Sequence, residues 1–349
     1  MKPLLLSLLT LPTLAYTPLS DHALTLLPPF KNTPRDPDPD FDPLASALLS
    51  PILRPRVPGT PGHAAVQHHF VSWVQKNLHP SWRIEWHNTT AETPIHGKGV
   101  RVPFANLVLR RDPPWVKPYL PGIITPEQYG GSEAVKGKRL KSEGDVARLT
   151  LAAHYDSLYK PEGFIGAIDS AVPCALVLYA AKAVDEALTR KWEAMARVRE
   201  QRAAEGWDGL EDEDDDYEEE EKGLQIILFD GEEAWLKWSA EDSLYGSRAL
   251  ASTWSSLPYP SGSKYPTPLS SISLLLLLDL LGSPSPTIPS YFLHSHVHYL
   301  SLSNLESRLR KLNLLESSPR TPFLPDRDRD PRVVRGYVED DHMPFLKRG

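Results

Sequence analysis

The chain is poor in cysteine, since Cys174 is the single thiol among 349 residues. One cysteine excludes an intramolecular disulfide and a zinc site made of cysteine thiolates. Long apolar runs are also missing, because residues 4–11 and 274–281 fall far short of the about 20 residues that span a bilayer. Strong basic charge is absent too: 38 basic and 45 acidic side chains give a formal net charge of −7. This balance argues against nucleic acid as the main partner.

The remaining composition is that of a folded globular protein. Hydrophobic residues make up 41% and charged residues 24% of the chain, which excludes a coiled coil, a disordered chain and a collagen-like chain. The length allows one large α/β domain or two small ones, with enough apolar material for a core. The 35 prolines outnumber the 20 glycines and lie mostly in the N-terminal third and in loops, because proline disrupts regular helices and central strands.

The N-terminus, residues 1–15, has the pattern of a secretory signal peptide. Lys2 supplies the positive start, residues 4–11 the apolar run and Ala15 the small residue at the exit. An ordinary buried N-terminal segment is the alternative. The sequon Asn88-Thr89-Thr90 is consistent with secretion and makes Asn88 a candidate N-glycan site.

The rest of the chain divides into an extended segment and one domain. Residues 16–62 are rich in proline and aspartate, so we expect them to be extended and mobile. A single domain is predicted over residues 63–349. Within it, the acid-rich residues 206–222 predict a disordered, solvated insertion, because like charges at this density repel one another.

Apolar periodicity predicts the α/β class for this domain. Helical spacing follows Gly62 and recurs over residues 171–188, with a continuation toward residue 204, and over 244–257. Short apolar runs predict strands at residues 83–86, 105–109, 148–154, 224–230 and 271–281. Apolar strands that alternate with helices indicate a mostly parallel central sheet with helices on both faces.

Polar residues follow three of these predicted strands. They are His154-Tyr155-Asp156, Asp230-Gly231-Glu232-Glu233 and Asp279. In a parallel sheet, sites form where the carboxyl ends of the strands meet. Aspartate, glutamate and histidine are ligands of a catalytic zinc site, which takes three protein ligands and leaves one position for water or substrate. The pattern therefore favours a metal site at this edge.

Each of these acids also has a structural explanation. Glu232 and Glu233 can form a solvated pair at a helix start, where the dipole favours negative charge. Asp169 can cap the helix that opens at Ser170, and Asp279 needs a partner within its apolar strand. Several acids that converge at one sheet edge favour a shared site. One of two adjacent glutamates can then bind metal while the other transfers protons.

Several long motifs occur in a fixed order over residues 45–349. They are His154-Tyr155-Asp156-Ser157, residues 166–175, Phe229-Asp230-Gly231-Glu232-Glu233-Ala234, Trp238-Ser239, residues 242–248, Leu278-Asp279-Leu280-Leu281-Gly282 and Asp340-Asp341-His342-Met343-Pro344-Phe345-Leu346. Together they resemble the glutaminyl-peptide cyclotransferases (glutaminyl cyclases). This family shares its zinc exopeptidase-like fold, a phosphorylase/hydrolase-type α/β fold, with the zinc aminopeptidases.

The resemblance implies an enzyme that converts N-terminal glutamine of peptides to pyroglutamate and releases ammonia. It implies one zinc ion, with Asp169 and Glu233 as ligands, and Glu232 as the general acid/base. Asp279 and Asp340 match acids in the hydrogen-bond network beside that glutamate, and Trp238 matches an aromatic wall of the substrate pocket.

The chain departs from the family pattern in its third zinc ligand. The family places a histidine of a Trp-His pair well past the Pro-Phe-Leu motif, so this ligand and one core strand are expected beyond Gly349. His154 matches a second-metal ligand of the aminopeptidases, which leaves one metal or two open. Two other functions stay open: a secreted zinc aminopeptidase that uses the same ligands, and an inactive protein that keeps the pocket for binding.

Other candidate ligands are interpreted as structural. His294, His296 and His298 are spaced like a metal cluster, but on a helix only His294 and His298 share a face. We therefore expect surface histidines. Ala153 stands where many animal relatives carry a cysteine that pairs with the one matching Cys174, so Cys174 is expected to be a buried free thiol.

Overall fold

The computed structural model describes residues 18–27, 38–118, 142–205, 222–315, 317, 319–330 and 338–349. The predicted signal peptide and residues 206–221 of the predicted acidic insertion lie outside these ranges. The elements are α1 (Asp21–Thr25), η1 (Ser50–Ile52), α2 (Pro61–Asn77), β1 (Arg83–Glu92), β2 (Arg101–Arg111), η3 (Glu143–Asp145), β3 (Ala147–His154), η4 (Ala167–Ala171), α4 (Val172–Ala204), β4 (Lys222–Phe229), α5 (Tyr245–Ser256), β5 (Ile272–Leu277), α6 (His296–Lys311) and α7 (Met343–Leu346).

The five strands form one sheet in the order β1-β2-β4-β3-β5. Strand β3 runs parallel to both of its neighbours, β4 and β5, whereas β2 is antiparallel to β1 and to β4. All strands except β2 therefore point the same way, and the expected mostly parallel sheet is confirmed. The predicted early strands at 83–86 and 105–109 are parts of the longer hairpin β1–β2.

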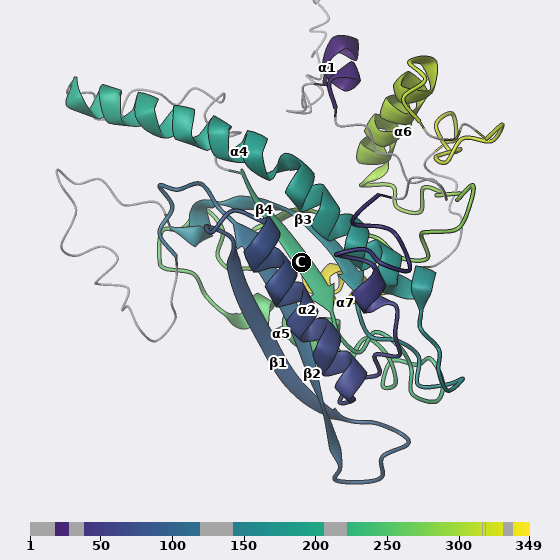
Figure 1. Ribbon diagram of the computed structural model, residues 1–349. Helices are drawn as coiled ribbons and strands as arrows, with labels where there is room; N and C mark the ends of the chain where they lie inside the picture. The colour runs from purple at the N-terminus through teal and green to yellow at the C-terminus, as the bar shows by residue number, and fades with distance from the viewer. Residues whose placement is uncertain are drawn as a thin grey trace, which may run out of the picture.

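Helices cover both faces of this sheet (Figure 1). Successive side chains of a strand point to opposite faces, so Leu107 and Leu109 of β2 pack in one core with α2 and α4, while Val108 packs in a second core with α5 and α7. The helices predicted after Gly62 and over 171–188 and 244–257 correspond to α2, α4 and α5. The α/β class is therefore confirmed.

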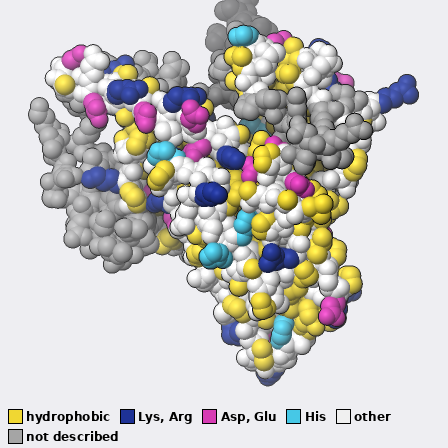
Figure 2. Space-filling model, viewed as in Figure 1, with side chains coloured by type: hydrophobic (Ala, Val, Ile, Leu, Met, Phe, Trp, Pro, Cys, Tyr) yellow, Lys and Arg dark blue, Asp and Glu magenta, His cyan; other side chains and the backbone are white. Residues whose placement is uncertain are grey.

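Helix α4 belongs to the core despite its length. By length and composition alone, residues Ala167–Arg202 could cross a membrane. Its first half is buried, with Cys174 and Leu178 fully inaccessible, and its second half projects from the sheet (Figure 1). Charged side chains of both signs lie along the projecting half (Figure 2). The exposed ion pair of Glu186 with Arg190 lies near the middle of the helix. These features are those of a core helix with a solvated extension.

The proline- and aspartate-rich segment differs from expectation where it is described. Residues 38–60 are not a mobile linker, because Phe41, Leu48 and Ile52 are buried in the core with α2 and α4. Their aspartates form local turns, as when Asp38 Oδ1 accepts the N–H of Asp40 at 2.8 Å. Apolar residues between the prolines provide the burial that holds the segment in place. The boundary at residue 62 stays a prediction.

A buried ion pair ties β2 to the start of β3. Arg148 is fully buried, and its Nε and one terminal nitrogen donate to the two carboxylate oxygens of Asp112 at 2.9 and 2.8 Å. Burial opposes ionisation of Asp112, but Arg148 and Arg83 outweigh it and hold the pKa of Asp112 below its usual range. The two hydrogen bonds are charge-assisted, and loss of either partner of a pair with so little solvent access would leave the other charge buried and uncompensated.

We expect Asp112→Asn to destabilise the fold by about 3 kcal/mol, because it leaves the buried Arg148 charge without its counter-ion. The folded pKa of Asp112 lies below its unfolded value of about 3.9. The pair therefore stabilises above that pH, and its contribution disappears as the pH falls through the folded pKa. Urea unfolding from pH 7 to pH 3 measures both effects.

The matched control is Glu186→Gln, which breaks the exposed pair with Arg190 on α4. It should cost less than about 0.5 kcal/mol. Equal losses in the two variants would contradict a stabilising role for the buried pair.

Candidate functional site

The site is built around the imidazole of His154 at the carboxyl end of β3. The side chain is 1% exposed and lies among carboxylates from three other segments. Its Nε2 lies 2.9 Å from Asp169 Oδ1, 3.5 Å from Asp279 Oδ1 and 3.9 Å from Glu232 Oε2. The ends of β3, β4 and β5 therefore meet at one point, as expected for neighbouring parallel strands.

Asp156 holds the neighbouring glutamates in place. Its carboxylate is fully buried, and its Oδ1 and Oδ2 accept the backbone N–H groups of Glu232 and Glu233, both at 3.1 Å. Oδ1 also lies 3.3 Å from His154 Nδ1. One carboxylate therefore fixes the imidazole and the turn that carries both glutamates. Sequence reasoning assigned no role to Asp156, although its place two residues after His154 marked it as a strand-end acid.

The turn after β4 has a second support on its other side. Asp230 Oδ1 lies 2.8 Å from His63 Nε2 of α2, and its Oδ2 accepts the N–H of Ala105 at 2.7 Å. The next residue, Gly231, has φ +70°, and a Cβ there would lie 2.3 Å from the ring of Phe104. Only glycine therefore fits this turn. The sequence motif contained Asp230 but gave no indication of His63.

Asp279, Asp340 and Trp238 were also predicted for this site, and each has a polar partner in the structure. Ser170 donates a short hydrogen bond to Asp279 Oδ1, and Asp340 Oδ1 accepts the N–H of Asp341 at 2.6 Å. Trp238 is 37% exposed, and its indole N–H donates to Glu339 Oε2 at 3.3 Å. The tryptophan therefore lies at the rim, next to the segment that carries Asp340.

Burial and mutual repulsion shift the pKa values of these acids. Burial raises the pKa of Glu233 to about 8, with Asp156, Asp169 and Asp279 adding to the shift and His154 opposing it. Burial and the charge of Asp279 raise the pKa of Asp340 to about 6. The pKa of Glu232 is also raised, chiefly by burial. Acids that resist ionisation in this way form a site that favours a cation.

The pKa of the His154 imidazole is also raised, but by attraction to the acids rather than by burial. Burial alone would lower the pKa of His154, but Glu232 and the hydrogen-bonded carboxylates raise it well above its ordinary value. The surrounding carboxylates therefore stabilise positive charge at this point, whether a proton on His154 or a bound cation supplies it.

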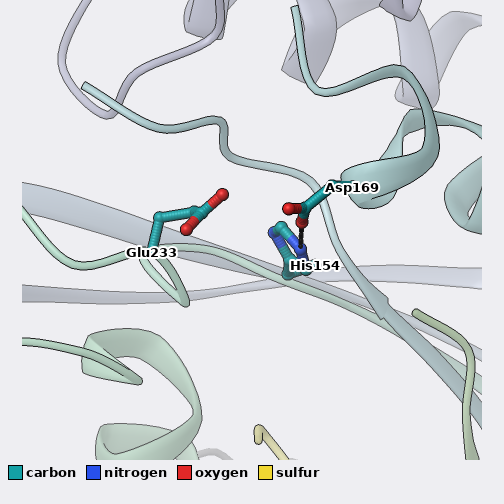
Figure 3. A group of neighbouring side chains, drawn as sticks. All are labelled: His154, Asp169 and Glu233. Atoms are coloured by element: carbon teal, nitrogen blue, oxygen red, sulfur yellow. Dashed lines mark hydrogen bonds and ion pairs between the residues drawn. The ribbon is translucent and has the colours of Figure 1, made fainter. Parts of the chain in front are cut away.

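His154, Asp169 and Glu233 have the geometry of a metal site. Each offers one ligand atom, and the three atoms lie within 4.8 Å of one another. Figure 3 shows Asp169 hydrogen bonded to His154, with Glu233 pointing toward them from the loop after β4. Glu233 Oε1 is buried, and no described group donates a hydrogen bond to it. One nitrogen donor and two carboxylates, one of which has an unsatisfied oxygen, fit a divalent cation such as zinc.

The structure thus brings the predicted acids Asp169, Glu232, Glu233 and Asp279 around His154. The nitrogen donor of this group is His154, which the family resemblance matched only to a second-metal ligand. The third zinc-ligand histidine that the resemblance implied was expected beyond Gly349. The assignment of individual roles to these residues, and to Asp340 and Trp238, stays a prediction.

The structure also bears on the predicted free thiol and on the predicted surface histidines. Cys174 is a buried free thiol, as expected, and its Sγ donates to the carbonyl oxygen of His154 at 3.0 Å. His294 is exposed, but the surface interpretation is wrong for His296. Its ring stacks on Tyr299 and its Nδ1 lies 2.9 Å from Ser290 Oγ. Helix α6 begins at this residue and turns the side chain inward.

Comparison with known proteins adds independent information. The model of peptidase family M28 matches residues 137–349. The chain is 35% identical over 309 residues to a glutaminyl-peptide cyclotransferase-like protein of Bos taurus, covering 88% of this chain and 63% of the relative. It is 35% identical over 307 residues to the glutaminyl-peptide cyclotransferase of Bos taurus, covering 86% of this chain and 68% of the relative. The chain therefore spans less than two thirds of the first of these relatives.

A solved structure agrees with these sequence matches. A glutaminyl cyclase of Macrostomum lignano superposes with a TM-score of 0.59 at 31% identity, covering 86% of this chain and 73% of the other.

We expect Zn²⁺ to raise the melting temperature of the metal-free protein, because a ligand that binds only the folded state stabilises it. At about 100 times the dissociation constant the gain is about 2.7 kcal/mol. Asp169→Asn should lose most of this gain, since it removes one carboxylate ligand. Differential scanning fluorimetry after chelator treatment measures the shift.

Glu162→Gln is the matched control, because Glu162 is an exposed acid on the same connection between β3 and η4. It should respond to zinc like the unmodified protein. A zinc response that survives in Asp169→Asn, or that is lost in both variants, would show that the metal binds elsewhere.

Proposed function

The chain belongs to peptidase family M28 and, within it, to the glutaminyl-peptide cyclotransferases, and we propose that it converts an N-terminal glutamine of peptides to pyroglutamate with release of ammonia. The observation that carries this proposal is the convergence of Asp169, Glu232 and Glu233 on His154 at the strand ends. A buried acid beside a candidate metal site is suited to acyl transfer that needs both a Lewis acid and a proton carrier.

The reaction closes a five-membered ring within one residue. The α-amine of the substrate attacks the side-chain amide carbon, a nitrogen–carbon bond forms, and the bond from that carbon to the amide nitrogen breaks. The α-amine loses one proton, and the amide nitrogen gains one as it leaves as ammonia. Both partners belong to one residue, so the protein mainly has to orient them and move this proton.

Glu232 is the proposed carrier of this proton. Its side chain is 6% exposed, and burial raises its pKa well above the ordinary value. A carboxyl group with such a pKa can accept a proton from the amine and return it to the leaving nitrogen at neutral pH. Asp156 accepts the backbone N–H of Glu232, and Glu232 Oε2 lies 3.9 Å from His154 Nε2, so this carboxyl group is held beside the candidate metal site.

One zinc ion is the proposed cofactor, held by Asp169 and Glu233. His154 offers the third donor atom of the group. When bound there, zinc would polarise the amide carbonyl and lower the cost of negative charge on its oxygen. The acids of the site would in turn lose their mutual repulsion, since a divalent cation neutralises two of them.

Trp238 is the proposed wall of the substrate pocket, because it is a partly exposed aromatic ring beside the segment that carries Asp340. Peptides with N-terminal glutamine are the proposed substrates. A secreted location is proposed from the apolar residues 4–11. The sequon supports it, since Asn88 is exposed on the edge strand β1 and is accessible to an N-glycan.

An aminopeptidase is the second candidate, because the family model is that of peptidases and the same residues serve both reactions. In that case Glu232 would activate a water molecule rather than an amine. A non-catalytic protein that keeps the pocket is the third. The products of one incubation separate the three candidates.

Purified protein with zinc should release ammonia from a peptide that begins with glutamine and leave its N-terminus blocked. Coupled ammonia detection and mass spectrometry measure both products. Glu232→Gln should lower kcat by about 10²–10⁴-fold, because it removes the proton carrier. Glu241→Gln, an exposed glutamate on the loop that follows, should leave the rate unchanged. Free glutamine as product would indicate the peptidase, and no turnover with bound zinc would indicate the binding protein.

Trp238→Ala tests the proposed wall of the pocket. We expect KM for the peptide to rise by about tenfold, because the lost aromatic surface contributes about 1–2 kcal/mol of binding. Zinc content should not change. A normal KM in this variant would place the substrate elsewhere.

A further inference from the structure

Arg56 is a fully buried cation next to the candidate metal site. It has no exposed surface and is, with Arg148, among the largest completely inaccessible side chains. The two arginines differ in their partners. Arg148 pairs with the carboxylate of Asp112, whereas no described carboxylate lies within ion-pair distance of the Arg56 guanidinium.

Backbone carbonyl groups take the place of that carboxylate. Nε donates to Tyr155 O at 2.5 Å, and one terminal nitrogen donates to Gly166 O at 2.9 Å and to Asp169 O at 3.4 Å. The other terminal nitrogen donates to Ile165 O and, at 3.4 Å, to Arg54 O. The backbone N–H of Arg56 donates to Ser157 Oγ at 2.9 Å.

Most of these acceptors belong to one segment, the ligand loop, which we define as residues 155–169. This loop begins directly after His154 and ends at Asp169. Its chain folds tightly around the guanidinium: Gly166 has φ +47°, and a Cβ there would lie 2.1 Å from Asp169 O and 3.0 Å from Arg56. The arginine therefore contacts both ends of the ligand loop. One end follows His154 directly and the other is Asp169, and these are two of the three candidate ligands.

We propose that Arg56 is a positioning residue, which holds the two ends of the ligand loop together so that Asp169 and His154 present their ligand atoms to one cation. This inference rests on the proposed metal site and extends it to a residue about 100 positions earlier in the chain. The guanidinium donates to backbone carbonyl groups rather than to the side chains of the candidate ligands, so it would act through the backbone of Asp169 and Tyr155.

The planar guanidinium suits this task better than an ammonium group. Arginine carries five N–H donors in a fixed fork, which matches carbonyl groups that approach from several directions. Lysine has three donors on a flexible stem and would leave buried carbonyl groups unsatisfied. Burial lowers the pKa of Arg56, and nearby acids, among them Asp156, Asp169 and Glu233, oppose that shift. The cation thus also lies in the field of the acids that it positions.

The test measures zinc affinity and stability separately in the full chain. Arg56→Lys should weaken zinc binding by about 10–100-fold, the range for residues that orient metal ligands, in competition with a chromogenic chelator. Arg56→Gln should lose at least as much. Arg148→Lys is the matched control: it disturbs a buried arginine far from the ligand loop, so its stability should fall while its zinc affinity stays within about twofold.

A second variant covers the case in which Arg56 variants do not fold. Ser157→Ala removes only the hydroxyl that accepts the Arg56 N–H, and we expect a smaller loss of zinc affinity in the same direction. Equal zinc affinity in Arg56→Lys and the unmodified protein, or equal losses in Arg56→Lys and Arg148→Lys, would overturn the positioning role. No zinc binding by the unmodified protein would instead refute the proposed metal site.

Discussion

The structure depends on the burial of several carboxylates around one imidazole. Asp156, Asp169, Glu232 and Asp279 all lie within hydrogen-bond or ion-pair distance of His154. Desolvation makes such a group of charges unstable unless a cation, a proton or a donor compensates each acid. Glu233 Oε1 is left without a donor among the described groups. A divalent cation would resolve this imbalance. The raised pKa of Glu232 has burial as its main cause.

Segments far apart in the sequence hold these acids in place. Asp156 receives the N–H groups of the turn after β4, while His63 and Ala105 hold that turn through Asp230. Arg56 holds the loop on the other side through its carbonyl groups. Each contact uses a buried polar group that would be costly to leave unpaired. The precision of the site therefore comes from backbone hydrogen bonds as much as from the acids themselves.

The sequence predicted the α/β class, the alternation of strands and helices, and the polar strand ends that meet at His154. These features follow from local periodicity and from the geometry of parallel sheets. The antiparallel hairpin β1–β2 was predicted only as short pieces, because residues 88–92 of β1 are mostly polar and Pro103 lies within β2.

Contacts between distant segments could not be predicted. Residues 38–60 were predicted to be mobile because they belong to a segment rich in proline and aspartate, yet Leu48 and Ile52 anchor them in the core. Nothing local to Arg56 or His63 indicates that each meets a backbone or side chain about 100 or more residues away. Such partners are set by tertiary packing, so single-sequence reasoning can identify the acids of the site but not the groups that orient them.

The most direct measurement is an anomalous difference map from crystals grown with zinc, with data collected on both sides of the zinc absorption edge. The account predicts one peak about 2.0–2.2 Å from carboxylate oxygens of Asp169 and Glu233. A map without a peak there, or crystals in which those two side chains point away from each other, would contradict it.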